Sequence, residues 1–263
     1  MILFDYGHTL CYEPGFDGVA GIRAVMKYAT HNKKNLSAEE ISAFSDSLYN
    51  EVAGKARDVD LEVHNQISER FMYEYLQIGF DIPWREIERI FWDNIAPCEI
   101  MPDIDKVLAY LKKSSIRSGV ISNMSFSGDN LTDRINRLLP GNDFEFVIAS
   151  SEYMYRKPNK MIFELALRKA DLPTSEVWFC GDSVNYDIVG AASAGIFPVW
   201  YHSNIERNYG DSSLDVHPEF ELLYIRDWTE FIGIIDRVAN DDNSPPKKSD
   251  TTNPTPPNNI TGK

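Results

Sequence analysis

The chain begins with Met1-Ile2-Leu3-Phe4-Asp5-Tyr6-Gly7-His8-Thr9-Leu10, in which three large apolar residues lead directly into an isolated carboxylate. A short apolar run of this kind is typical of a buried parallel strand, so the acid is expected at the strand's carboxyl end. Ligands of open α/β sheets bind at that edge. Taken alone the stretch is a weak signal, because apolar runs that end in Asp also precede ordinary turns.

Three further polar clusters follow apolar runs of strand length. They are Gly119-Val120-Ile121-Ser122-Asn123, then Arg156-Lys157-Pro158, and then Val177-Trp178-Phe179-Cys180-Gly181-Asp182-Ser183 with Asp187 behind it. In this order and at this spacing the clusters resemble the four motifs of the haloacid dehalogenase (HAD) superfamily, over roughly residues 1–201. Four ordered matches are far more specific than any one of them. The resemblance implies a HAD-like hydrolase with a Rossmann-like core.

Strand patterns and helical patterns alternate regularly after residue 102. Strands are expected at 118–121, 144–149, 177–180 and 197–201, with an edge strand at 222–225. Helices are expected at 102–111, 130–139, 160–170, 184–194 and 228–238. Such alternation predicts an α/β fold with a doubly wound parallel sheet and right-handed crossovers.

Residues 15–97 carry four helical patterns and no strand pattern. The first runs over 18–30, the second opens with the capping box Ser37-x-x-Glu40, and the fourth follows Pro83. We therefore predict an all-helical insert between the first and second strands of the sheet. In HAD proteins an insert at this place forms a mobile cap over the active site. An independent helical bundle without a lid role is the alternative.

The expected organisation is a catalytic core made of residues 1–14 and 98–239, a cap at 15–97 and a tail at 240–263. The tail consists mainly of Asn, Asp, Pro, Ser, Thr and Lys, with Ile260 as its one large apolar residue. Such a segment buries too little apolar surface to offset its chain entropy, so we expect it to be disordered.

The composition and the net charge of the chain limit the kinds of molecule that it is expected to bind. With 43% hydrophobic and 12% aromatic residues the chain reads as an ordinary globular protein. A net charge of −14 would repel a polyphosphate backbone, and the basic residues form no stripe that would overcome it, so nucleic acid is an unlikely partner. The sequence carries no signal for the oligomeric state.

The three cysteines and the first residues indicate the compartment. Cys11, Cys98 and Cys180 are widely spaced and show no zinc-binding pattern, which favours reduced thiols. Met1 leads directly into the first strand, and no apolar run approaches about 18 residues. We therefore expect a cytoplasmic protein with no leader and no membrane span.

Transfer of a phosphoryl group to a protein carboxylate needs a nucleophile, donors to the phosphate oxygens and a divalent ion. The resemblance implies that Asp5 is the nucleophile and forms an aspartyl-phosphate, and that Lys157 reaches both Asp5 and the phosphate. Hydroxyl and amide donors are available from Thr9, Ser122 and Asn123. The hard oxygen ligands that Mg²⁺ prefers would come from Asp5, Asp182 and the carbonyl of Gly7, with Asp187 as nearby support.

Position 7 departs from the family pattern. The usual phosphatase version is Asp-x-Asp-x-Thr, whose second Asp protonates the leaving group and then deprotonates the attacking water, and here that residue is Gly7. General acid–base catalysis contributes about 10²- to 10⁴-fold in rate. His8 is the nearby titratable group, but it stands one residue along, where the chain points elsewhere, so a packing role is the simpler expectation.

Three functions stay open. The favoured one is a Mg²⁺-dependent phosphatase that acts on a small phosphorylated metabolite. A dehalogenase-like or phosphonatase-like hydrolase is the second, although dehalogenases do without the metal-binding acids and a phosphonatase needs a specific cap lysine. The third is a protein that binds phosphoryl ligands without catalysis.

Overall fold

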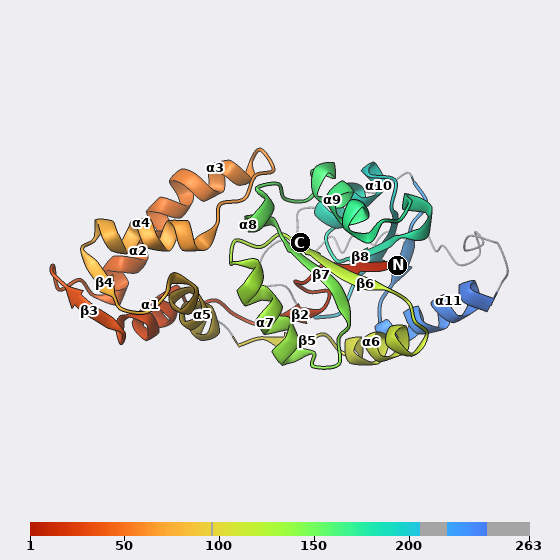
Figure 1. Cartoon of the computed structure of the whole chain (residues 1–263), viewed down its shortest axis with the longest axis horizontal. Coiled ribbons are helices and arrows are strands. Elements are labelled where there is room, and N and C mark those ends of the chain that lie inside the picture. The colour runs from red at the N-terminus through yellow and green to blue at the C-terminus, as the bar shows by residue number, and fades with distance from the viewer. Residues whose placement is uncertain (96, 206–219, 241–263) are drawn as a thin grey trace, which may run out of the picture.

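The computed structural model describes residues 1–95, 97–205 and 220–240 of the 263-residue chain. Its centre is a six-stranded sheet in the order β10-β9-β8-β1-β6-β7, and every pairing in it is parallel (Figure 1). The strands are β1 (Ile2–Phe4), β6 (Ser118–Ser122), β7 (Phe144–Ala149), β8 (Trp178–Gly181), β9 (Phe197–Tyr201) and β10 (Leu223–Ile225). The predicted doubly wound sheet is therefore confirmed.

Both faces of the sheet are buried, which explains why its strands read as continuous apolar runs. Successive side chains of β1 point to opposite faces: Ile2 and Phe4 pack with α6, α7 and α11, whereas Leu3 packs with α9 and α10. The helices of the core are α6 (Ile104–Lys113), α7 (Gly128–Leu138), α8 (Ser150–Tyr153), α9 (Lys160–Ala170), α10 (Gly190–Ser193) and α11 (Trp228–Asn240). Figure 1 shows α6 and α11 on one side of the sheet and α9 and α10 on the other.

The strand order determines where a ligand can bind. From the central strand β1 the chain moves to β6 and β7 on one side, and it then returns to β8 on the other side. Phe4 pairs with Val120 of β6 and with Cys180 of β8, so the residues that follow these three strands meet at one edge of the sheet. Ligands of such folds usually bind at the point of the sheet where the strand order reverses.

The helix expected at 184–194 differs in detail. Its first part is η3 (Val184–Val189), a wide π-helical turn, and α10 follows it directly. The Asp187 carboxylate folds back onto the backbone N–H groups of Asp182 and Ser183, which ties the beginning of this turn to the end of β8. Widened helical turns of this kind are frequent at functional sites.

Residues 15–95 form a layer of helices beside the sheet with an apolar cluster of their own, around Ile22, Ile41, Met72 and Ile87 (Figure 1). Its helices are α1 (Gly18–Met26), α2 (Ala38–Leu48), α3 (Gly54–Arg57), α4 (Asn65–Tyr75) and α5 (Trp84–Ile95), with a π-helical turn η1 (Tyr49–Ala53) between α2 and α3. The capping box of Ser37 and Glu40 at the start of α2 is confirmed.

The prediction of an all-helical insert was wrong at one place. The first helix ends at Met26, and β3 (Ala29–Asn32) then pairs antiparallel with β4 (Ile78–Phe80). The His31 ring occupies the space beside Gly79, where an added Cβ would lie 2.1 Å from it, so a larger residue there would require the ring to move. These strands are short and half polar, and their partners are far apart in sequence, so no local apolar alternation reveals them.

A second antiparallel pair connects the insert to the sheet. The chain passes from the sheet to the insert through β2 (Cys11–Tyr12) and returns to the sheet through β5 (Glu99–Ile100), and these two strands pair with each other. This pairing brings together two cysteines that are distant in sequence, and the Cys98 thiol also lies 3.3 Å from the Tyr6 hydroxyl. A hydrogen bond from the Cys11 thiol lowers the pKa of Cys98 to about 7. All three cysteines are free thiols, as expected from the sequence.

Within the described ranges, no helix is long and apolar enough to cross a membrane. The predicted disordered tail lies almost wholly outside the described residues.

Glu69 in α4 yields a prediction for stability. It is buried near the equally buried Glu88, and desolvation, followed by the charge of Glu88, raises its pKa well above the usual range. A raised pKa in the folded state favours the protonated acid, so this contribution to stability is present at low pH and is lost as pH rises above about 4.5.

We therefore expect Glu69→Gln to stabilise the protein at about pH 8 and to have little effect at about pH 4.5. Each 1 kcal/mol gained would raise Tm by about 2–4 °C. The control is Glu74→Gln, which removes an exposed acid from the same helix. Thermal unfolding at both pH values measures the effect, and a benefit that is equal at the two would contradict the assignment.

Candidate active site

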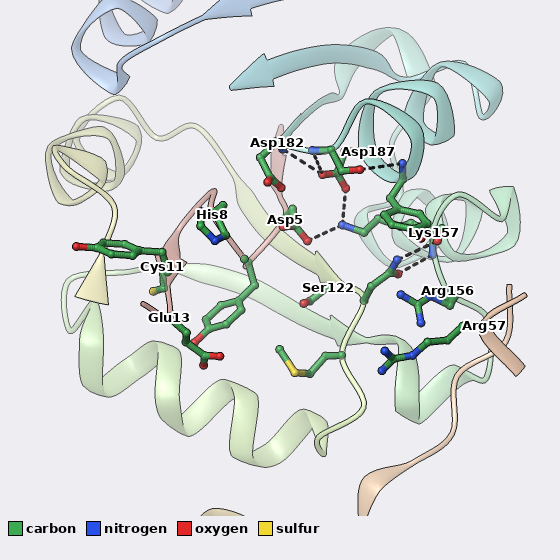
Figure 2. A pocket seen from close by; sticks show the side chains of 17 residues that line it. Asp5, His8, Cys11, Glu13, Arg57, Ser122, Arg156, Lys157, Asp182 and Asp187 are labelled. Atoms are coloured by element: carbon green, nitrogen blue, oxygen red, sulfur yellow. Dashed lines mark hydrogen bonds and ion pairs between the residues drawn. The ribbon is translucent and has the colours of Figure 1, made fainter. Parts of the chain in front are cut away.

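Three buried carboxylates meet at the carboxyl edge of the sheet. Asp5 follows β1, Asp182 follows β8, and Asp187 lies in η3. One carboxylate oxygen from each lies within 4.8 Å of those of the other two. Figure 2 shows the three acids converging from these separate segments. The predicted nucleophile and the predicted metal-binding acids are therefore in one cluster.

Lys157 is a buried cation that contacts this cluster. Its Nζ donates to Asp5 Oδ1 and to Asp187 Oδ1, both at 2.6 Å, and it lies 5.1 Å from the centre of the Phe179 ring. Burial alone would lower the pKa of Lys157, but the carboxylates of Asp187 and Asp5 outweigh burial and raise it. Burial raises the pKa of Asp5 to about 6 against the opposing charge of Lys157.

Asp187 uses both of its oxygens within the protein. One accepts from Lys157, and the other accepts from the backbone N–H groups of Asp182 and Ser183 at 3.1 and 3.0 Å. Gly181 permits this approach, because a Cβ there would lie 2.4 Å from Asp187. Asp187 is thus placed to orient Lys157 and the turn that carries Asp182, and Asp5 and Asp182 are the carboxylates best placed to bind a metal directly.

The charges fit a divalent cation. Three carboxylates face a single ammonium, so the buried cluster carries an excess of two negative charges when all are ionised. Such an excess is costly in a buried site unless a cation neutralises it. Oxygen ligands from Asp5 and Asp182 suit Mg²⁺, and Gly7, whose carbonyl is the third predicted ligand, lines the same cavity.

The cavity above the cluster has a volume of about 470 Å³. Ser122, at the end of β6, lines it as predicted. Asn123 also lines it, but its side chain holds the backbone of Lys157, donating to the carbonyl at 2.9 Å and accepting from the N–H at 2.7 Å. The Asn123 amide therefore positions Lys157.

Thr9 is the predicted site residue that the structure does not bring into the cavity. It is fully buried, and its hydroxyl has no hydrogen-bond partner among the described residues. His8, by contrast, lines the cavity, with its backbone in the left-handed region at φ 51°. The His8 side chain is almost fully buried, and Figure 2 shows it on the opposite side of Asp5 from Lys157.

Sequence reasoning missed two arginines that line the same cavity, Arg57 and Arg156. Arg57 stands in the insert, where no motif marks it. Arg156 is part of the Arg-Lys-Pro motif, but the sequence assigned it no role. Its side chain faces a cavity that insert and core form together, and a local sequence pattern does not reveal such a cavity.

Comparison with known proteins gives an independent result. A family model described as haloacid dehalogenase-like hydrolase matches residues 1–195. A glyceraldehyde 3-phosphate phosphatase of Pyrococcus furiosus is 23% identical over 92% of this chain and 95% of that protein. A phosphoglycolate phosphatase of Yersinia pestis is 28% identical over 52% of this chain and 56% of that protein.

Among solved structures, a 2-haloacid dehalogenase from Pseudomonas syringae pv. Tomato superposes with a TM-score of 0.58 at 18% identity, covering 90% of this chain and 98% of that one. At this identity the likeness shows a shared fold. The family model, in turn, matches most of the chain. The chain belongs to the haloacid dehalogenase-like hydrolases.

Proposed function

We propose that the protein is a Mg²⁺-dependent phosphatase of a small phosphorylated metabolite. The observation that carries this proposal is the buried ammonium of Lys157 bridging Asp5 and Asp187 within the cluster of three carboxylates. Two of the relatives described above are named as phosphatases of three-carbon and two-carbon phosphates, which supports the substrate class.

The residues suit a two-step transfer. Asp5 attacks the phosphorus and becomes an aspartyl-phosphate, while Lys157 and the Ser122 hydroxyl stabilise the charge on the phosphate oxygens. The bond between phosphorus and the leaving-group oxygen breaks in this first step. Water then attacks the phosphorus of the aspartyl-phosphate, so that Asp5 is regenerated as a carboxylate and inorganic phosphate leaves with the oxygen and protons of the water. Mg²⁺ held by Asp5, Asp182 and the Gly7 carbonyl would supply further charge neutralisation. Asp187 and Asn123 act as positioning residues for Lys157.

A proton must still reach the leaving group in the first step. Gly7 offers no acid, and both of its neighbours line the cavity. Burial raises the pKa of Tyr6 well above its usual range, which leaves His8 as the better proton donor. We assign the transfer to His8 where the leaving group needs a proton. This assignment replaces the packing role expected from the sequence.

We further propose that residues 15–97 act as a cap on a core formed by residues 1–14 and 98–239. Away from β2 and β5, polar and aromatic contacts both join the two parts. Asn65 N–H donates to the Ser125 carbonyl at 2.8 Å, and the buried Glu88 accepts from Ser127 and Asn130. The Trp92 ring of α5 stacks on Phe126 of the core. Hydrogen bonds of this kind can be exchanged with water, as opening of a cap requires.

The deciding experiment is turnover of para-nitrophenyl phosphate with Mg²⁺ and with EDTA. Hydrolysis that depends on Mg²⁺ supports the proposal. Binding of inorganic phosphate without any turnover would instead identify a protein that binds phosphoryl ligands without catalysis.

A further prediction concerns the metal. Asp182→Ala removes one of two direct carboxylate ligands, so we expect the affinity for Mg²⁺ to fall roughly 10-fold or more. Calorimetric titration with Mg²⁺ measures this, with Asp105→Ala on the surface of α6 as the matched control. An unchanged affinity would move the metal site away from Asp182.

A further inference from the structure

Two guanidinium groups share the wall of the cavity that lies away from Asp182. Arg57 ends α3 in the insert, with a third of its side chain exposed, and Arg156 precedes Lys157, with its side chain 9% exposed. Figure 2 shows the two groups next to each other, both directed toward the interior of the pocket. They stand apart from the acidic cluster, whose cation is Lys157.

The two arginines share a single buried carboxylate. Glu62 lies 3.3 Å from Arg57 Nε and 3.3 Å from Arg156 Nη1, and its side chain is 1% exposed. The same carboxylate also accepts a hydrogen bond from the Ser150 hydroxyl at 3.1 Å. Two positive charges therefore face one negative charge, which leaves an excess of one positive charge beside the cavity.

Arg156 in particular keeps unused hydrogen-bonding capacity. Its Nη1, although close to Glu62, makes no well-oriented hydrogen bond to any residue in the described part of the chain. Burial lowers the pKa of Arg156, with Glu62 opposing and Arg57 adding to the effect. A buried cation in this state is stabilised by any further anion that reaches it.

We propose that Arg57 and Arg156 bind a second acidic group of the substrate, a carboxylate or a further phosphate at the end remote from the phosphate that Asp5 attacks. Planar guanidinium groups match the oxygens of such anions. The cavity of about 470 Å³ extends from Asp5 to both arginines, so one small molecule can contact both ends of it. This inference rests on the proposed phosphatase function and specifies its substrate class.

The substrates named for the two phosphatase relatives differ in whether they carry such a second acidic group. Phosphoglycolate carries a carboxylate at the end remote from its phosphate, whereas glyceraldehyde 3-phosphate ends in an uncharged aldehyde. The arginine pair therefore favours an acidic substrate over the one named for the relative that covers most of this chain.

The second anion would also connect the two parts of the molecule. Arg57 belongs to the insert and Arg156 to the core, and the segments that carry Glu62 and Arg156 already pair through Glu62 N to the Met154 carbonyl at 2.6 Å and Arg156 N to the Asp60 carbonyl at 3.0 Å. An acidic substrate held by both arginines adds a link across this boundary, so its binding favours the closed arrangement.

The test compares matched substrates. We expect 2-phosphoglycolate to be hydrolysed with a higher kcat/KM than 2-hydroxyethyl phosphate, which has the same length and an uncharged end. The bisphosphate of ethylene glycol distinguishes a further phosphate from a carboxylate as the preferred group. In Arg57→Gln, kcat/KM for the acidic substrate should fall roughly 10- to 100-fold, mainly through KM.

Turnover of 2-hydroxyethyl phosphate by Arg57→Gln should change less than about threefold, and Arg57→Lys should lie between this variant and the wild type. The control Arg70→Gln removes an exposed arginine of the same insert, paired with Glu74, and should leave the preference unchanged. Equal losses on acidic and neutral substrates in Arg57→Gln, or no preference in the wild type, would overturn the inference while leaving the phosphatase function in place.

Binding separates the two proposals further. Calorimetry with Asp5→Asn compares the affinities for 2-phosphoglycolate and 2-hydroxyethyl phosphate without turnover. A preference for the acidic ligand that disappears in the double variant Asp5→Asn with Arg57→Gln supports the arginine site even if no phosphatase activity exists. Equal affinities for the two ligands reject it.

Discussion

Asp5→Asn is expected to lower phosphatase activity by roughly 10³-fold or more, because an amide of the same shape cannot act as the nucleophile. The structure makes this substitution informative. Asp5 Oδ1 accepts from Lys157 at 2.6 Å, and an asparagine oxygen can accept the same bond, so the geometry of Lys157 should be kept. The loss then reports on the attack itself.

Steady-state hydrolysis of para-nitrophenyl phosphate measures the effect, and circular dichroism verifies the fold. Asp105→Asn provides the same chemical change on the exposed side of α6 and should be silent. Activity above a few per cent of wild type in Asp5→Asn would remove Asp5 from the role of nucleophile.

The second large effect that we expect is a gain in catalytic activity. Gly7→Asp restores the acid of the family motif, so turnover of alkyl phosphates should rise by up to about 10²-fold, and more than turnover of aryl phosphates. Aryl leaving groups are stable anions and need no proton, whereas alkoxides do. Gly7 lines the cavity, and among the described glycines the one with positive φ is Gly195, so a side chain at position 7 meets no strain from a left-handed backbone.

His8 is the competing source of the proton, and its removal tests the assignment. We expect His8→Ala to reduce alkyl-phosphate turnover by roughly 10-fold or more and to spare aryl phosphates. If Gly7→Asp gives little gain, the double variant Gly7→Asp with His8→Gly shows whether the His8 side chain blocks the new carboxylate or whether the carboxylate itself is ineffective. If wild type hydrolyses alkyl phosphates at ordinary rates and His8→Ala changes nothing, the proton comes from another group or from water.

The sequence predicted those parts of the molecule that depend on local pattern. The strands that end at Phe4, Ser122 and Gly181 are buried on both faces, so they appear as apolar runs, and the polar residues at the end of each run mark the edge of the sheet. The strand at Phe144–Ala149 and the helix at Lys160–Ala170 agree with the sequence to the residue.

What could not be predicted depends on contacts between distant segments. β3 and β4 pair across the insert, and Arg57, Arg156 and Glu62 come together only when the insert lies against the core. The roles of single side chains are equally non-local: the Asn123 amide binds the backbone of Lys157, 34 residues away.

The polar contacts of Glu62, Asn65 and Glu88 between insert and core have a calorimetric consequence. Heat capacity rises when apolar surface enters water and falls when polar surface does. Separation of the two parts exposes these carboxylate, amide and hydroxyl groups, but it also exposes Trp92 and Ile95 of α5, which pack in the apolar cluster of the core. The two kinds of surface change the heat capacity in opposite directions, so the heat-capacity change of opening should be well below that of unfolding, and a van't Hoff plot of the open population should be less curved than that of global unfolding.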